Sequence, residues 1–312
     1  MIRDNIKGKG EDKGGGKSEG RSEGGEEGRG VRGGRILTFD IPDVCSASLI
    51  PGRSRPINGR GGDFNAGKIG DSVYIDLNLG IVAVADGPER NPSASSVFIK
   101  KLRAAIHGSP NFGSPPRIFS ESLFKGAFEE LVETANVISK GTDYHNATTF
   151  SALFTGLRDE GEGGSAGRGR CGLYSAILHT GDSMIFKISA GTGEVSRLTK
   201  TNHFLIGRAP RLFQAEFLSE IDEVIEGGDT VLLSTDGLND LARSHGITTE
   251  DFLAQEIVGL NPRGITRRIG SLAGGAKIRL DDIGLVCLVP GAAICRHLNK
   301  AVPGIILEDA VG

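Results

Sequence analysis

The chain has 312 residues, enough for one large domain or two small ones. Its formal net charge of −3 lacks the basic excess of a nucleic-acid-binding protein, and its four cysteines lack the paired spacing of a zinc site or disulfide framework. No segment has the apolar length of a membrane span or a signal-peptide core, so we expect a cytoplasmic protein with no membrane partner.

The first 34 residues are almost entirely glycine and charged residues. Such a segment cannot bury enough apolar surface to offset the entropy lost on ordering, so residues 1–34 are expected to form a disordered tail. We expect one folded domain over residues 35–290. The remaining residues, 291–312, form a C-terminal tail whose order the sequence leaves undecided.

Within this domain the apolar pattern first predicts two strands, 73–77 and 80–85, joined by a tight turn. Two helices with apolar residues at helical spacing follow, at 93–107 and 120–139. The later strands are expected at 148–154, 172–179, 183–188, 195–198, 213–218, 231–235 and 283–289. The last two long helices are expected at 248–258 and 262–272. Helices do not alternate with strands, which favours two packed antiparallel sheets with outer helices over a doubly wound parallel sheet.

Two aspartates stand at the downstream ends of predicted buried strands, and glycine follows each of them. Asp86 comes after the apolar run 81–85, and Asp236 comes after the run 231–235. An Asp-Gly pair is most often a hairpin turn, but neither pair here is followed by a returning strand. A carboxylate at such a position is costly unless a positive charge meets it. The pattern therefore favours cation binding.

A third acidic pair, Asp281-Asp282, stands directly before the predicted closing strand. Together with Asp86 and Asp236 it suggests a shared cluster of divalent cations. Carboxylate oxygens without neighbouring histidine or cysteine pairs are typical of magnesium or manganese sites rather than zinc sites.

Six short acidic or hydroxyl-bearing motifs occur in order along the domain. They are Gly70-Asp71-Ser72, Asp86-Gly87, Ala147-Thr148-Thr149, Gly181-Asp182-Ser183, Thr235-Asp236-Gly237 and Asp281-Asp282. Each is weak alone, but their order and spacing together resemble the PPM family of metal-dependent protein serine/threonine phosphatases, also called the PP2C family. The resemblance implies an α+β fold, a four-layer αββα sandwich, with a binuclear Mg²⁺ or Mn²⁺ site at one end of the two sheets.

Carried over by position, the resemblance assigns metal ligands to this chain. Asp86 would bridge two ions, and the Gly87 carbonyl would reach the second ion. Asp236 and Asp281 would complete the first ion, and Asp182 would contribute to a third, weaker one. The activity implied is hydrolysis of phosphoserine or phosphothreonine in a phosphoprotein by a metal-activated water, with Asp86 and Asp236 acting through that water.

The first motif departs from the family pattern. Asp71 matches a supporting aspartate, but the glutamate expected before it, a second-metal ligand, is Gly70, and the arginine expected to hold the phosphate is Ala66. Three basic residues stay open as substitutes for that arginine: Lys68, Arg60 and Arg90. These departures motivate an alternative, a catalytically weak or inactive regulatory or phospho-binding module of the same fold.

Overall fold

The computed structural model describes residues 36–52, 69–88, 91–109, 112, 118–158, 172–207, 214–218, 225, 228–276, 280–297 and 304–308. The predicted tail 1–34 lies outside these residues, as do the four positions considered for the phosphate-binding arginine. Within the described residues, no helix combines the length and apolarity needed to cross a membrane.

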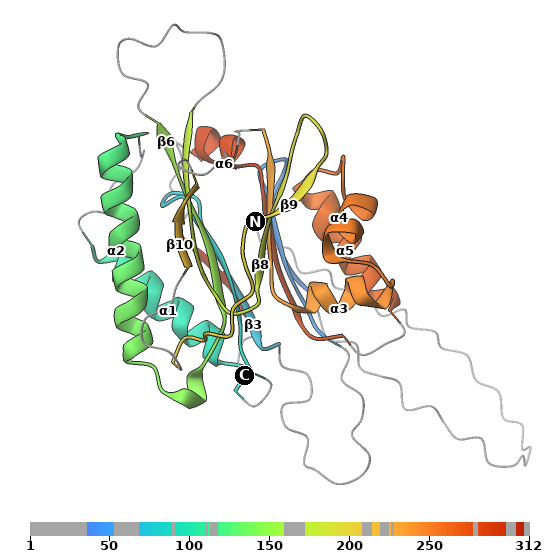
Figure 1. Cartoon of the computed structure of the whole chain (residues 1–312), viewed down its shortest axis with the longest axis horizontal. Helices are drawn as coiled ribbons and strands as arrows, with labels where there is room; N and C mark the ends of the chain where they lie inside the picture. Colours follow the sequence, from blue (N-terminus) through green and yellow to red (C-terminus); the bar gives the residue numbers. More distant parts are fainter. Residues whose placement is uncertain are drawn as a thin grey trace, which may run out of the picture.

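Two sheets pack face to face, and helices cover their outer faces (Figure 1). The first sheet runs in the order β1 (Leu37–Ile41), β2 (Cys45–Ile50), β12 (Ile283–Leu288), β11 (Thr230–Ser234), β8 (Met184–Ile188) and β9 (Val195–Arg197). The second sheet runs in the order β10 (Gln214–Phe217), β7 (Leu173–Thr180), β6 (Phe150–Arg158), β4 (Ile81–Asp86), β3 (Asp71–Asp76) and β13 (Ile305–Leu307), and β5 (Ile118–Phe119) pairs with β6 off this path. The pairings along both paths are antiparallel.

The helices form the two outer layers of the sandwich. The second sheet is covered by α1 (Ala94–His107) and α2 (Glu121–Lys140), and the first by α3 (Gly237–Ser244), α4 (Thr249–Glu256) and α5 (Pro262–Gly275) (Figure 1). Side chains cap the starts of three of these helices: Ser120 accepts the Leu123 N–H before α2, Thr248 accepts the Asp251 N–H before α4, and Asn261 accepts the Gly264 N–H before α5. The predicted αββα sandwich is confirmed.

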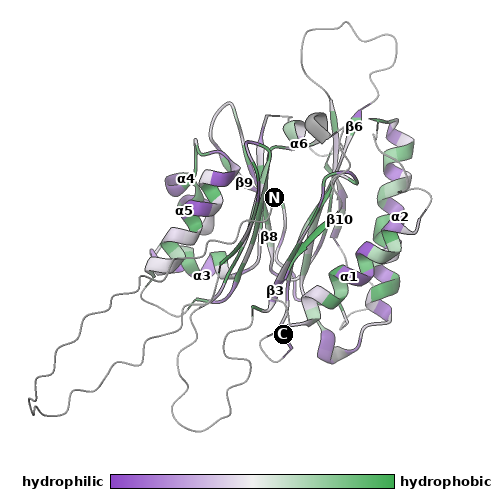
Figure 2. Cartoon of the chain, turned by 180° about the vertical axis from the view of Figure 1, so that it is seen from behind, coloured by the Kyte–Doolittle hydropathy of each residue, from purple (hydrophilic) through white to green (hydrophobic). Residues whose placement is uncertain are grey.

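Three apolar layers hold the sandwich together, and hydrophobic stretches run through strands of both sheets (Figure 2). Buried aliphatic side chains such as Val84, Leu233 and Val286 fill the space between the sheets. Aromatic rings dominate the layer under α1 and α2, where Phe124 stacks on Phe154 with ring centroids 4.6 Å apart. Burial on both faces explains why the central strands read as continuous apolar runs.

The chain beyond residue 290 also contributes to the fold. Helix α6 (Pro290–His297) follows β12, and β13 pairs with β3 at the edge of the second sheet. The Lys100 ammonium lies 2.7 Å from the Glu308 carboxylate, linking α1 to the residue after β13. A strand of three residues shows no usable periodicity, so the sequence gives little sign of it.

Candidate metal centre

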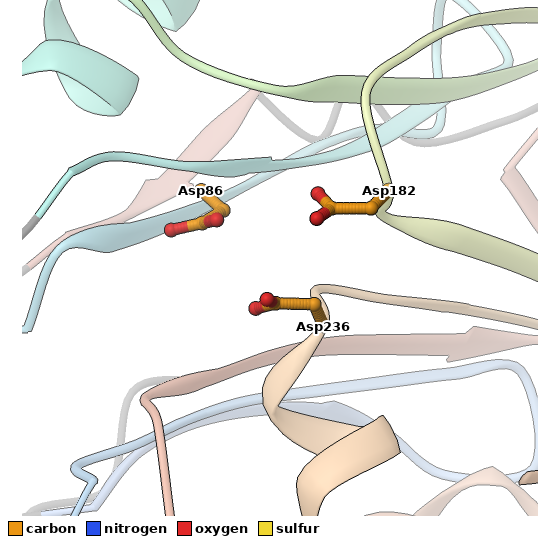
Figure 3. Close-up of side chains that lie close together, drawn as sticks. All are labelled: Asp86, Asp182 and Asp236. Carbon is orange, nitrogen blue, oxygen red and sulfur yellow. The ribbon is translucent and has the colours of Figure 1, made fainter. Parts of the chain in front are cut away.

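Three aspartates from distant parts of the chain meet at one end of the sandwich (Figure 3). Asp86 is the last residue of β4, Asp182 lies in the turn between β7 and β8, and Asp236 lies between β11 and α3. Each offers a carboxylate oxygen, and the three oxygens all lie within 4.8 Å of one another. The structure thus brings together three of the positions selected from the sequence.

Strand register explains this convergence. The antiparallel pairing of β8 with β11 places Met184 opposite Ser234, so the residues just before β8 and just after β11 share one end of the first sheet. In the second sheet, β6 pairs Ser151 with Val84 of β4 and Phe150 with Thr180 of β7, so the ends of β4 and β7 lie at the same end of the sandwich. Asp236 occupies the position before α3 but makes no capping hydrogen bond, which leaves its carboxylate to face the other two.

The electrostatics of the cluster favour a bound cation. Burial, followed by the charge of Asp236, raises the pKa of Asp86 well above its ordinary value. Burial and the neighbouring Asp182 raise the pKa of Asp236 to about 7. Both shifts mean that the ionised carboxylates are unfavourable without a positive partner. A set of hard carboxylate oxygens fits Mg²⁺ or Mn²⁺, so the residues present fit the ions that the sequence predicts.

The acidic pair before β12 divides into two different environments. Asp281 is exposed and lies outside the group of three, although its charge contributes to the raised pKa values of Asp86 and Asp236. The Asp282 carboxylate instead accepts the Gly52 N–H at 2.6 Å and the Gly70 N–H at 2.7 Å. Asp282 therefore ties backbone segments together, a role that its sequence position does not reveal.

Asp71 lies buried behind the cluster. Its Oδ2 atom accepts hydrogen bonds from the Thr235 hydroxyl and the Gly284 N–H, both at 2.7 Å. Burial, then the charge of Asp86, raises its pKa well above the ordinary value. Because Asp71 also pairs with Asp86 across β3 and β4, it connects the second sheet to the ends of β11 and β12 in the first.

Gly70 and Gly87 pack backbone against backbone beside Asp86. The Gly87 N–H donates to the Gly70 carbonyl at 3.1 Å, and a Cβ atom added to Gly70 would lie 2.7 Å from the Gly87 carbonyl oxygen. Position 70 therefore supplies no carboxylate and has no room for a side chain unless the backbone shifts. The structure agrees with the sequence that the glutamate of the family motif has no counterpart at this position.

Hydroxyl groups connect the strand ends that carry the cluster. The Thr149 hydroxyl accepts the Asp86 N–H at 3.1 Å and lies 2.7 Å from the Ser183 hydroxyl, next to Asp182. The Thr148 hydroxyl donates to the Asp86 carbonyl at 2.6 Å. The Thr-Thr and Gly-Asp-Ser motifs noted in the sequence thus meet in space.

Comparison with solved structures bears on the family. No family model and no curated protein matches the chain. The PPM Ser-Thr phosphatase MsPP from Mycobacterium smegmatis, solved with cacodylate, aligns with a TM-score of 0.52 at 19% identity over 78% of this chain and 97% of its own. The Mycobacterium tuberculosis serine/threonine phosphatase PstP/Ppp aligns with a TM-score of 0.50 at 16% identity over 81% of this chain and 97% of its own.

These two alignments show that the chain has the PPM phosphatase fold. A further structure, the catalytic domain of PstP in complex with two manganese ions, covers 81% of this chain and 98% of its own at 18% identity, with a TM-score of 0.47. At such identities the likeness concerns the fold alone. The PPM resemblance seen in the sequence is confirmed at that level, and the roles of individual residues stay predictions.

Proposed function

We propose that this protein is a metal-dependent protein serine/threonine phosphatase that hydrolyses phosphoserine and phosphothreonine esters. One observation carries the proposal: the carboxylate oxygens of Asp86, Asp182 and Asp236 lie within 4.8 Å of one another at the end of a PPM-type sandwich. The PPM fold supports the reaction class, and the chemistry of the donor set supports a hard divalent cation.

In this proposal Asp86 and Asp236 hold Mg²⁺ or Mn²⁺, with Asp281 and the Gly87 carbonyl completing the ligands and Asp182 serving a weaker position. When bound, such ions lower the pKa of a coordinated water and offset charge on phosphoryl oxygens. The chain's own contribution is to hold the carboxylates close together, where the charge of a bound ion would favour their ionised forms.

The deciding experiment is Mn²⁺-dependent hydrolysis of p-nitrophenyl phosphate and of a phosphopeptide by the full chain and its Asp236→Asn variant. Loss of a metal ligand should exceed the roughly 10–100-fold cost of losing an outer-shell partner, so we expect at least about a hundredfold lower rate. Asp229→Asn is the matched control. This buried aspartate precedes the other end of β11, accepts the Ala190 N–H at 3.0 Å, and should tolerate the amide without loss of rate.

Each result has a clear meaning. Full activity in Asp236→Asn would overturn the metal assignment. If the folded wild-type chain binds Mn²⁺ but hydrolyses neither substrate, the result would favour a phospho-binding module over a phosphatase.

A further inference from the structure

The turn that carries Asp182 is held by a second segment, residues 199–206. The Asn202 side-chain oxygen accepts the Gly181 N–H at 2.8 Å and the Phe204 N–H at 3.1 Å. The Asn202 backbone N–H donates to the Gly181 carbonyl at 2.8 Å. Both backbone polar groups of the residue immediately before Asp182 are therefore bonded to one asparagine.

The same segment makes further contacts with this end of the sandwich. The Thr180 hydroxyl donates to the Phe204 carbonyl at 2.8 Å. Ile206 and Thr148 exchange backbone hydrogen bonds at 3.0 and 3.3 Å. The segment thus connects the Asp182 turn to the residue that bonds the Asp86 carbonyl.

The hydrogen bonds to this turn hold Asp182 close to the other carboxylates despite their mutual repulsion. The Asp182 and Asp236 carboxylates each have an oxygen within 4.8 Å of the other, so the two side chains repel each other when both are ionised. If the turn were free to move, this repulsion would push Asp182 away from the cluster when no cation is bound. Rigid backbone hydrogen bonds hold it in place and reduce the reorganisation that binding requires.

We propose that Asn202 is a positioning residue of the metal centre, which fixes the Asp182 carboxylate beside Asp86 and Asp236 by holding the backbone of Gly181. The inference rests on the proposed function of this cluster as a metal centre. Asn202 acts through Asp182 and is not itself assigned as a ligand.

The test is calorimetric titration of the full chain with Mn²⁺. Removing both side-chain acceptor bonds with Asn202→Ala should weaken Mn²⁺ binding roughly 10–100-fold, the usual cost of losing an outer-shell partner. Asn202→Asp keeps an oxygen that can accept the same two N–H groups, and it should restore binding to the wild-type level. If Asn202 had a purely structural role, the folded Asn202→Ala and Asn202→Asp variants would bind Mn²⁺ with the same affinity.

Asn261→Ala provides the matched control. The Asn261 side chain also accepts a backbone N–H, that of Gly264 at 2.8 Å, and it bonds Asp43 in the turn between β1 and β2, away from the cluster. This variant loses a helix cap and should bind Mn²⁺ as tightly as the wild type.

A double-mutant cycle tests whether Asn202→Ala weakens Mn²⁺ binding through Asp182 or by a general effect on the fold. In an Asp182→Asn background, Asn202→Ala should weaken Mn²⁺ binding no further, because the group it positions is already lost. Additive effects, or wild-type affinity in folded Asn202→Ala, would overturn the inference. Failure of the wild type to bind Mn²⁺ would instead overturn the metal centre itself.

A second variant covers the case in which Asn202→Ala does not fold. Thr180→Val removes the hydroxyl that donates to Phe204 with little change in volume. It should weaken Mn²⁺ binding in the same direction, and unchanged binding in this variant would count against the positioning role.

Discussion

At the scale of single residues, Asp71 shows how a buried carboxylate can serve the site without belonging to the group of three. Its Oδ2 atom pairs with one hydroxyl and one N–H. Asp71→Ala would leave the Thr235 hydroxyl with only a long contact to the Gly284 carbonyl at 3.5 Å, while the Gly284 N–H would keep its bond to the Thr235 hydroxyl at 2.8 Å. One buried donor thus loses its good acceptor, so we expect the free energy of unfolding in urea to fall by about 1–3 kcal/mol.

Asp71→Asn is the informative comparison, because an amide oxygen can accept both hydrogen bonds and the charge is gone. Without metal it should unfold at the same urea concentration as the wild type or a higher one, since burial and Asp86 disfavour the charge. Equal destabilisation by both substitutions would show that the charge, and not the hydrogen bonding, is what matters here.

The sequence identifies some site residues and cannot identify others. Asp86 and Asp236 stand out because a carboxylate beside an apolar run conflicts with burial, and that conflict is visible without a structure. Asn202 carries no such mark, since its partners Gly181 and Phe204 are defined only by how the segments fold together. Asp282 resembles its neighbour Asp281 in sequence, and only the backbone groups around it distinguish the two.

At the scale of elements, the β3–β4 hairpin depends on one glycine. Gly80 has φ +67°, and a Cβ atom there would lie 2.0 Å from the Thr155 carbonyl oxygen. Gly80→Ala combines an unfavourable backbone region with a clash, so we expect a loss of about 2–4 kcal/mol in unfolding free energy. Thermal unfolding followed by circular dichroism would measure it.

Gly126 provides the opposite control within α2. An added Cβ there meets nothing within 4 Å, so Gly126→Ala should stabilise the protein by up to about 1 kcal/mol through helix propensity. A lower Tm for Gly126→Ala would contradict the open helical environment of Gly126. An unchanged Tm for Gly80→Ala would contradict the positive φ and the close approach to Thr155 at Gly80.

At the scale of the whole molecule, the cluster couples stability to pH. The pKa of Asp236 is about 7 when folded and 3.8 ordinarily, so the native state binds this proton more tightly than the unfolded state does. The contribution of Asp236 to stability should therefore fall as pH rises from about 4 to about 7. In EDTA, the Tm of the wild type relative to Asp236→Asn should decline across that range.

Mn²⁺ should reverse the trend, because binding requires deprotonated carboxylates and releases their protons. The rise in Tm on adding Mn²⁺ should grow with pH over the same interval. A wild-type Tm in EDTA that climbs relative to Asp236→Asn would contradict the raised pKa.

Fold prediction succeeded where elements are long and periodic. Helix α2, with its apolar stripe and Ser120 cap, is recognisable from sequence alone, as is the apolar strand β12. Strand β2 was not predicted: its run 45–50 alternates apolar residues with serine as a strand can, but Ile50 is its only β-branched or aromatic residue. Strand β13 was missed because three residues carry too little pattern and its pairing with β3 joins distant parts of the chain.

The pairing of β13 with β3 limits how far the chain can be shortened at its C-terminal end. Residues 305–307 cover the outer hydrogen-bonding edge of β3, the strand that begins at Asp71 beside the carboxylates. A chain shortened before Gly304 would leave the N–H and C=O groups along that edge bare. Bare edges of this kind recruit strands from other copies, so shortened protein should self-associate, with β3 as the point of contact.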